Sequence, residues 1–308
     1  MKQQQPLVSV VMPVHNAEQF IKQAIESIAK QTYLNWELII VNDHSSDRTK
    51  NVIMEFKDKR IIYYENNKWL GHANSANRAL KLSRGELIAI LDADDVTEAE
   101  RLEMQVSEMV ANPKLVIIGS WARVIDANGD QTALWRFPTQ SKQLKAQMYI
   151  QFPIVHSSAM LRKSALEKEK KWCNKKFNPG EDYELFFRLS HWGDVAVIPQ
   201  YLTGYRIHGQ NMSLTNRSGY IKSLPILLQR ELLLIGLDLS NSEVANLVYF
   251  LHPNLMQKHQ IKTALFTLFV IHKQIASHFG LGQFDLMPWN VYVCKTVIYQ
   301  LLSQIRPH

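Results

Sequence analysis

The sequence predicts an α/β protein in which strands and helices alternate over the first 111 residues. Four short runs rich in β-branched and aliphatic residues are typical of buried strands. Helix-period stretches separate them, so the strands should pair in parallel through right-handed crossovers, with helices on both faces of the sheet. The four predicted strands are VSVVMPV (8–14), WELIIVN (36–42), RIIYYE (60–65) and ELIAIL (86–91).

Helices are expected after each of these strands. The last of the four is predicted to begin in a T-x-x-E capping box formed by Thr97 and Glu100. The predicted helices cover about residues 17–31, 45–56, 72–83 and 97–110.

After residue 115 the pattern changes to mixed strands and helices. Asn128–Gly129 lies between two apolar runs and predicts a hairpin. The predicted strands are 114–126, 131–137, 156–161, 194–200 and 202–209, and the predicted helices are 141–150 and 181–192.

Beyond about residue 215 the strand signals end. The remainder predicts a helical appendage with helices at 223–237, 242–251, 262–279 and 289–305. We therefore expect two regions, 1–214 and 215–308, the first divided into halves of about 1–111 and 112–214.

The composition is that of a soluble globular protein. Of the 308 residues, 46% are apolar and 20% are charged, and the formal charge of +7 favours an anionic partner such as a nucleotide or a phospholipid surface. Cys173 and Cys294 form no disulfide or zinc pattern, and no signal-peptide or membrane-spanning pattern is present. These features predict a cytoplasmic protein.

Three polar clusters directly follow predicted strands: PVHN (13–16), NDHSSD (42–47) and DADD (92–95). The carboxyl ends of parallel strands meet at one edge, which is where such sheets bind ligands. Helix capping is an alternative reading for Asn16, and for Asp43 or Asp47. It does not apply to the DADD cluster if Thr97 caps the next helix, and paired carboxylates suit Mg²⁺ or Mn²⁺.

The motifs VSVVMPVHN, WELIIVNDHSSDRT, GHANSANRALKLSRGELIAILDADD and GEDYELFFRL resemble, in order and spacing, those of glycosyltransferase family 2. The resemblance covers about residues 7–210 and implies an inverting enzyme with the GT-A fold, a mixed sheet flanked by helices. It also implies the members of a nucleotide-sugar site. These are Pro13, His15, Asn16, Asp43 (toward the uracil ring), Gly71, Asp92 (near the ribose) and Ala93.

By the same resemblance, Asp94 ligates a metal bound to the diphosphate, and His208 is a second candidate ligand. Asp182 aligns with the general base that deprotonates the acceptor hydroxyl. Glu181 and His156 are candidates for the acceptor pocket. A purely structural reading of Glu181 and Asp182 is that they complement the dipole at the start of a helix.

The expected function is therefore transfer of a hexose or N-acetylhexosamine from a UDP-sugar to a glycan or lipid-linked saccharide, with Mn²⁺ or Mg²⁺ as cofactor. The resemblance favours surface-polysaccharide synthesis, of lipopolysaccharide or capsule. A nucleotide-sugar-forming nucleotidyltransferase is an alternative, but PVHNAEQF lacks the basic glycine-rich loop that such enzymes carry. A binding protein without catalysis is a second alternative, against which Asp94 and Asp182 argue.

We expect no nucleic-acid partner. The basic run 162–176 predicts a solvated helix face, with contact to an anionic membrane surface as its alternative. The helical tail leaves three interpretations open: peripheral attachment to the inner face of the cell membrane, packing on the catalytic region, or an oligomer interface.

Overall fold

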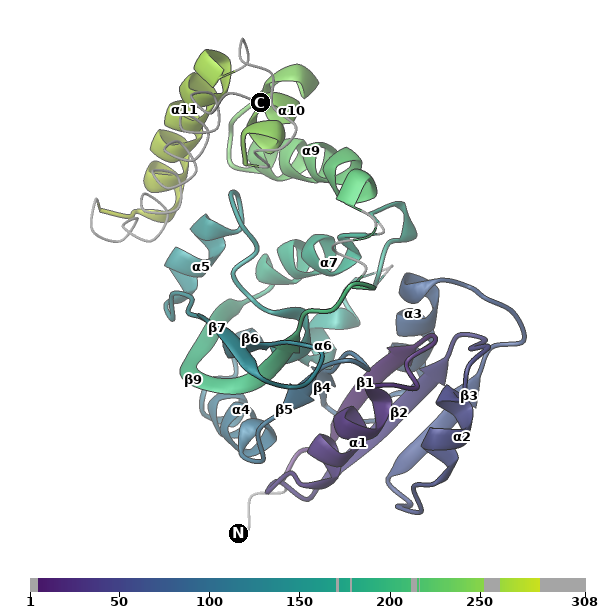
Figure 1. Cartoon of the computed structure of the whole chain (residues 1–308). Coiled ribbons are helices and arrows are strands. Elements are labelled where there is room, and N and C mark those ends of the chain that lie inside the picture. The colour runs from purple at the N-terminus through teal and green to yellow at the C-terminus, as the bar shows by residue number, and fades with distance from the viewer. Residues whose placement is uncertain are drawn as a thin grey trace.

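Strands from both predicted halves of residues 1–214 join one nine-stranded mixed sheet (Figure 1). The structure is a computed structural model that describes residues 5–169, 172–177, 179–211, 215, 217–251 and 261–282, and the strand count applies to these residues. The order across the sheet is β3-β2-β1-β4-β8-β6-β9-β5, with β7 paired to β6. The strands are β1 (Val8–Val14), β2 (Trp36–Asn42), β3 (Ile61–Glu65), β4 (Leu87–Ile90), β5 (Val96–Thr97), β6 (Leu115–Ile125), β7 (Gln131–Trp135), β8 (Met160–Arg162) and β9 (Asp194–Arg206).

Alternation along the strands creates two cores, one on each face of the sheet. In β1, Val10 and Met12 enter one core while Val11 enters the other. The first core is covered by α1 (Ile21–Ala29), α2 (Thr49–Met54) and α4 (Arg101–Ala111). The second is covered by α3 (His72–Leu82), α5 (Ser141–Gln147) and α7 (Glu181–Ser190). The predicted α/β class is confirmed.

The strand directions bring the polar clusters to one edge of the sheet. Strands β1, β2 and β4 are parallel, so the residues that follow each of them lie at the same edge. Strand β8 is antiparallel to both β4 and β6, and β9 is parallel to β6, so β6 and β9 also end toward this edge.

The chain after residue 215 forms helices α9 (Arg217–Leu234), α10 (Asn241–Leu251) and α11 (Ile261–Phe279) in its described part. Buried leucine and isoleucine residues of all three helices belong to the same core as α5 and α7. Figure 1 shows these helices at the end of the molecule beyond α5 and α7. The predicted helix 289–305 lies outside the described residues. Among the residues described, no helix combines the length and apolarity that crossing a bilayer requires.

Four local predictions are wrong. Thr97 is not a helix cap: it lies in β5, its hydroxyl donates to the Leu202 carbonyl at 3.0 Å, and the helix begins at Arg101. Residues 156–158 form the 3₁₀ turn η1 (His156–Ser158), which leaves β8 only three residues.

In the basic run 162–176, the helical parts are α6 (Lys163–Leu166) and η2 (Lys175–Phe177), so it is not one continuous helix. The two strands predicted at 194–209 are the single strand β9. Pairing with β9 outweighed the local pattern at Thr97, and pairing with β6 did so along β9.

Candidate active site

The DADD cluster follows β4, and two histidines lie close to its first aspartate, Asp92. The Asp92 carboxylate receives the Ser157 hydroxyl at 3.0 Å and faces the His156 Nδ1 at 3.0 Å. His72 Nε2 lies 3.9 Å from the other Asp92 oxygen. Burial alone would raise the pKa of Asp92, but the two imidazoles hold it well below its usual range. Asp92 is therefore ionised and positioned by groups that are far away in the sequence.

Burial alone would lower the pKa values of the two histidines, but the neighbouring carboxylates outweigh it. Asp92 and Glu181 raise the pKa of His72 to about 10, and Asp92 is the main group that raises the pKa of His156 to about 9. Both rings are thus imidazolium ions at neutral pH. Their ring centres are 5.9 Å apart, so two positive charges lie side by side at the edge of the sheet.

Asp94 and His208, the two predicted metal ligands, lie side by side. His208 follows β9, and its Nε2 is 2.9 Å from the Asp94 carboxylate. Asn211 supports the pair. Its side-chain oxygen accepts the backbone N–H of His208, and its side-chain nitrogen is 3.5 Å from the same Asp94 oxygen. Burial and the charge of Asp92 raise the pKa of Asp94.

These residues fit a divalent cation that is completed by its substrate. A carboxylate and an imidazole are acceptable ligands, and Mg²⁺ typically combines one or two carboxylates with phosphate oxygens and water. Among the described residues, no group of three His, Cys, Asp or Glu side chains forms a closed protein site. The donor set is therefore too small for a structural metal, and it suits an ion that also binds a diphosphate.

Asp95, the third aspartate, has a structural role. It is 1% exposed, and its carboxylate accepts the backbone N–H of Arg206 at 2.7 Å. The Arg206 guanidinium in turn donates to the Asp94 carbonyl at 2.7 Å. Arg101 is fully buried, and this burial lowers its pKa to about 9, although the charge of Asp95 partly opposes the effect. Asp95 thus ties the end of β9, from which His208 projects, to the DADD loop.

Helix α7 brings the second acidic pair to the site. It begins after Gly180, whose φ of 110° is in the left-handed region. Glu181 is 4% exposed and accepts a hydrogen bond from His72 Nδ1 at 2.8 Å. Asp182 accepts the backbone N–H of Tyr183 at 2.7 Å. Burial raises the pKa of Asp182, and the nearby His156 charge partly offsets this effect.

Asp182 lines a small cavity between α7, α3 and the sheet. Pro13 and His156 line the same cavity, so residues from β1, η1 and α7 meet there. Cys173 also lines it, and burial raises the pKa of this thiol far above its usual value, which makes it a poor nucleophile. The cavity brings the predicted base next to predicted nucleotide and acceptor residues.

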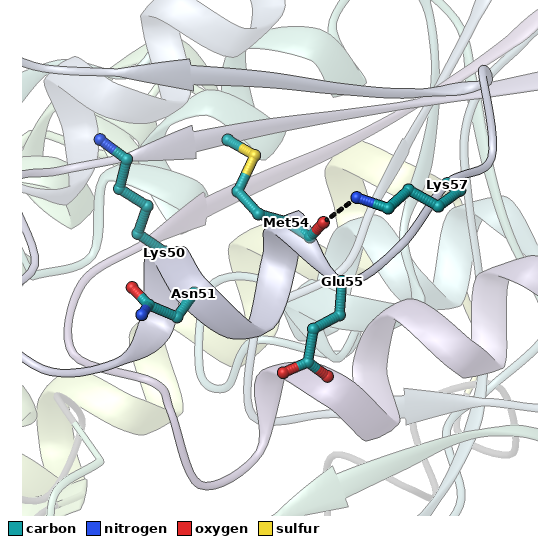
Figure 2. A pocket seen from close by; sticks show the side chains of 5 residues that line it. All are labelled: Lys50, Asn51, Met54, Glu55 and Lys57. Carbon is teal, nitrogen blue, oxygen red and sulfur yellow. Dashed lines mark hydrogen bonds between the residues drawn. The ribbon is translucent and has the colours of Figure 1, made fainter.

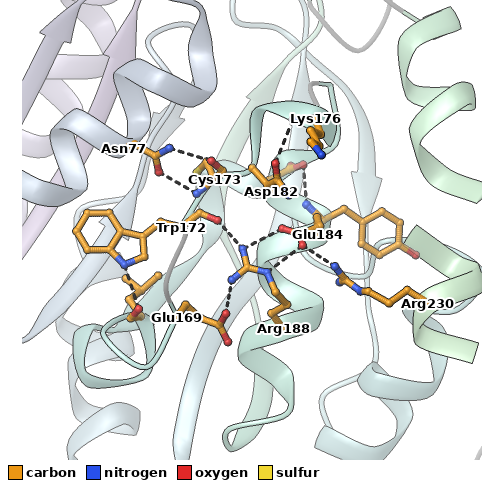
Figure 3. Close-up of polar contacts among 12 residues, drawn as sticks. Asn77, Glu169, Trp172, Cys173, Lys176, Asp182, Glu184, Arg188 and Arg230 are labelled. Atoms are coloured by element: carbon orange, nitrogen blue, oxygen red, sulfur yellow. Dashed lines mark hydrogen bonds and ion pairs between the residues drawn. The ribbon is translucent and has the colours of Figure 1, made fainter. Parts of the chain in front are cut away.

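A loop–helix framework holds the wall beside Asp182 (Figure 3). The Asn77 side chain makes two 2.8 Å hydrogen bonds with the backbone of Cys173. Arg188 donates to the Trp172 carbonyl and binds Glu184 through two hydrogen bonds of 2.9 Å. The segment around Cys173 is thus fastened to α3 on one side and to α7 on the other.

Asp43 has protein partners that the sequence did not suggest. It is 2% exposed, and its oxygens accept the N–H groups of Leu70 and Gly71 at 2.9 and 2.7 Å and the Asn66 amide at 2.7 Å. A Cβ added to Gly71 would meet no atom within 4 Å, so the backbone conformation, with φ 86°, is what requires glycine there. Asp43 therefore shapes the loop that leads into α3, and its predicted contact with uracil remains a prediction.

Of the other predicted nucleotide residues, His15 and Asn16 lie beside the segment that contains Asp43, and Ala93 lies under the DADD loop. His15 is exposed, and its Nδ1 lies 2.8 Å from the Asp43 carbonyl oxygen. Asn16 has φ 49° and accepts the Ser46 N–H at 2.8 Å, so it joins two of the polar clusters and does not cap α1. Ala93 packs in the core beneath the DADD loop.

A separate surface hollow on α2 contains none of the predicted site residues (Figure 2). It is lined by Lys50, Asn51, Met54, Glu55 and Lys57. Its polar contact in Figure 2 is a local bond of 2.9 Å from the Lys57 ammonium to the Met54 carbonyl. It has no buried acid–base cluster, so we place the chemistry at the edge of the sheet.

Sequence reasoning missed His72, Ser157, Arg101 and Arg206. Arg206 is part of the YRIHG stretch, in which the sequence pattern indicated a role only for His208. His72 lies inside the GHANSAN motif, and nothing in that motif singles it out. Its partners Glu181 and Asp92 are 109 and 20 positions away, and no local pattern signals such contacts.

Comparison with known proteins identifies relatives of the chain. A family model described as "Glycosyl transferase family 2" matches residues 9–169. An uncharacterized glycosyltransferase of Methanocaldococcus jannaschii is 35% identical over 71% of this chain and 74% of its own length. The Escherichia coli protein WfgD, named UDP-Glc:alpha-D-GlcNAc-diphosphoundecaprenol beta-1,3-glucosyltransferase, is 45% identical over 37% of this chain and 46% of its own.

A solved structure, S. aureus TarS residues 1–349 in complex with UDP-GlcNAc, is similar in fold. Its TM-score is 0.63 at 18% identity, and the match covers 95% of this chain and 88% of that one.

Proposed function

The chain belongs to glycosyltransferase family 2 and has the predicted GT-A fold, and from this premise we propose that it transfers a hexose or N-acetylhexosamine from a UDP-sugar with inversion. The acceptor is a hydroxyl of a glycan or a lipid-linked saccharide. The product belongs to a surface polysaccharide such as lipopolysaccharide or capsule. The name of the WfgD relative, with its UDP-Glc donor and lipid diphosphate acceptor, supports this substrate class.

One observation carries the proposal: the acids at the end of β4 and at the start of α7 meet around two imidazoles. His156 faces Asp92 at 3.0 Å, and its charge also acts on Asp182. His72 contacts Glu181 at 2.8 Å. A donor-binding carboxylate and a candidate base are therefore parts of one charged cluster, as a transfer between two bound substrates requires.

Asp182 would act as the general base. Its carboxylate would take the acceptor hydroxyl's proton while that oxygen bonds to the anomeric carbon and the bond from this carbon to the diphosphate oxygen breaks. Burial raises the pKa of Asp182, which moves its basicity toward neutral pH. Asp94 and His208 would hold Mn²⁺ or Mg²⁺, which neutralises charge on the leaving diphosphate when bound. Asp95 and Arg206 would keep these two ligands in place.

The donor assignment is tested by incubating the purified chain with a panel of UDP-sugars, with and without simple saccharide acceptors, and measuring released UDP. We expect one sugar to give release that an acceptor accelerates. Release from GDP-sugars alone would overturn the UDP assignment.

The metal assignment is tested by the melting temperature. UDP should raise the Tm in the presence of Mn²⁺ and much less with a chelator, and Asp94→Asn should show the small increase under both conditions. An equal increase with and without metal in the parental chain would contradict the assignment of Asp94 and His208.

We also propose that the chain works at the inner face of the cell membrane. Phe266 and Phe269 of α11 are each 67% exposed, and Lys273 on the same helix is also exposed. Apolar and basic side chains on one helix suit an anionic lipid surface. Co-sedimentation with phosphatidylglycerol vesicles should fall when both phenylalanines are changed to serine, and unchanged binding would exclude this helix as the contact.

A further inference from the structure

His72 is the first residue of α3 and contacts both acidic pairs of the site. Its Nδ1 is 2.8 Å from the Glu181 carboxylate, and its Nε2 is 3.9 Å from the Asp92 carboxylate. Glu181 belongs to α7, whereas Asp92 follows β4. A single side chain thus connects the two sets of carboxylates on which the proposed reaction depends.

The position of His72 is determined by the nucleotide half of the molecule. Asp43 accepts hydrogen bonds from the N–H groups of Leu70 and Gly71, the two residues directly before His72. Gly71 adopts φ 86°, which turns the chain into α3. The imidazole therefore reaches α7 from a backbone that is fixed by the loop beside the predicted nucleotide pocket.

Glu181 depends on this contact. It is 4% exposed, and within the described residues His72 is the side chain that forms a hydrogen bond or an ion pair with it. A buried carboxylate that loses its cation is strongly unfavourable, so the first turn of α7 would move to expose or re-pair Glu181. Asp182 is the next residue and would move with it.

We infer that His72 is a positioning residue, which sets the first turn of α7, and with it Asp182, relative to Asp92 and the donor. The role rests on the proposed transferase function. It differs from a purely structural role because it predicts a loss in the chemical step while the nucleotide site stays intact. Misplacement of a reacting group by about 1 Å can reduce a rate by about a hundredfold.

The test compares three variants with the parental chain. His72→Leu removes both donors and should lower kcat at least about tenfold. The KM for the UDP-sugar and the Kd for UDP should change much less, because His156 and Ser157 still hold Asp92. His72→Asn keeps a hydrogen-bond donor near the position of Nδ1 without the positive charge, so it should restore part of kcat. His72→Gln places its amide near Nε2 and should not.

The other end of α7 offers a matched control. His191 Nε2 is also 2.8 Å from a buried glutamate, Glu231. Because Arg230 also pairs with Glu231, His191→Leu should lower the Tm only slightly and leave kcat unchanged. If His72→Leu lowers the Tm and leaves kcat at the parental value, the inference is overturned.

A double-mutant cycle separates positioning from independent effects. If His72 acts through Glu181, then His72→Leu combined with Glu181→Gln should reduce kcat no further than the more severe single change. Losses that multiply would overturn the inference.

Hydrogen exchange keeps this test separate from the test of the proposed function. Should the parental chain transfer no sugar, the proposed function fails, but amides 181–184 can still be followed. They should exchange faster in His72→Leu and at the parental rate in His191→Leu. Equal rates at these amides in His72→Leu and the parental chain would overturn the positioning role.

Discussion

Arg188 in the last turn of α7 and Asp182 in its first turn differ in their pairing, although Glu181 beside Asp182 is paired with His72. At the C-terminal end of α7, Arg188 reaches back to Glu184 of the first turn and also binds Glu169 (Figure 3). Arg230 of α9 binds the same Glu184 and also Glu231. At the N-terminal end of α7, Asp182 forms a hydrogen bond with the Tyr183 N–H and, in the described part of the chain, no ion pair.

This difference separates structural from reactive charge. Saturated pairs hold α7 against its neighbours, including the tail helix α9. A buried carboxylate without a cation of its own keeps a raised pKa and can accept a proton. The contrast predicts that changes at one end affect activity and changes at the other affect stability.

The largest effect is expected at the reactive end. Asp182→Asn keeps the shape but removes the proposed base, so kcat should fall about 10²- to 10⁴-fold. The Kd for UDP should stay within about twofold, because Asp182 is on the acceptor side of the proposed site. UDP-release kinetics and calorimetric titration measure the two quantities, and transfer at the parental rate would place the base elsewhere.

At the paired end, Arg188→Met should mainly destabilise the fold, with a smaller effect on kcat because Arg188 also holds the wall beside Asp182. It leaves the buried Glu184 and the partly buried Glu169 with less positive charge, and breaking a buried pair typically costs about 3–5 kcal/mol. Urea unfolding gives this free energy. The control is Arg48→Met, because the Arg48–Glu18 pair is exposed and should change stability by less than about 1 kcal/mol. Similar losses in both variants would contradict the proposed difference.

The smallest effect is a pH dependence of stability with opposite sign at the two ends. Burial alone would raise the pKa of Glu169, but hydrogen bonds from Trp192 and Arg188 outweigh it and lower the pKa below 4.5. Its stabilisation is present above pH 4.5 and is lost as the pH falls through the lowered folded pKa. The pKa of His72 is raised from 6.5 to about 10, so its stabilisation is full below pH 6.5 and is lost as the pH rises toward 10.

Urea unfolding across this pH range tests both signs. The stability difference between the parental chain and Glu169→Gln should shrink at acid pH, and the difference for His72→Asn should shrink at alkaline pH. The same trend in both variants would show that the two ends of α7 are not electrostatically distinct.

Much of the fold could be predicted because its signals are local. Apolar runs of strand length marked β1 to β4, and Asn128–Gly129 marked the turn between β6 and β7. The helix boundary near Thr97 was wrong because a T-x-x-E pattern has the same local sequence whether or not a strand lies alongside. Here β9 pairs with Val96–Thr97 and moves the helix start to Arg101.

The sequence alone determined the α/β class, the polar clusters at the strand ends and the family to which those motifs belong, because each depends on neighbouring residues and their spacing. The tertiary structure alone decided how these groups are paired. It joined His72 to Glu181, His208 to Asp94 and the Arg206 backbone to Asp95, across 109, 114 and 111 positions of sequence. Such contacts form only when the sheet edge, α3 and α7 pack together, and burial then shifts the pKa values of these acids and imidazoles.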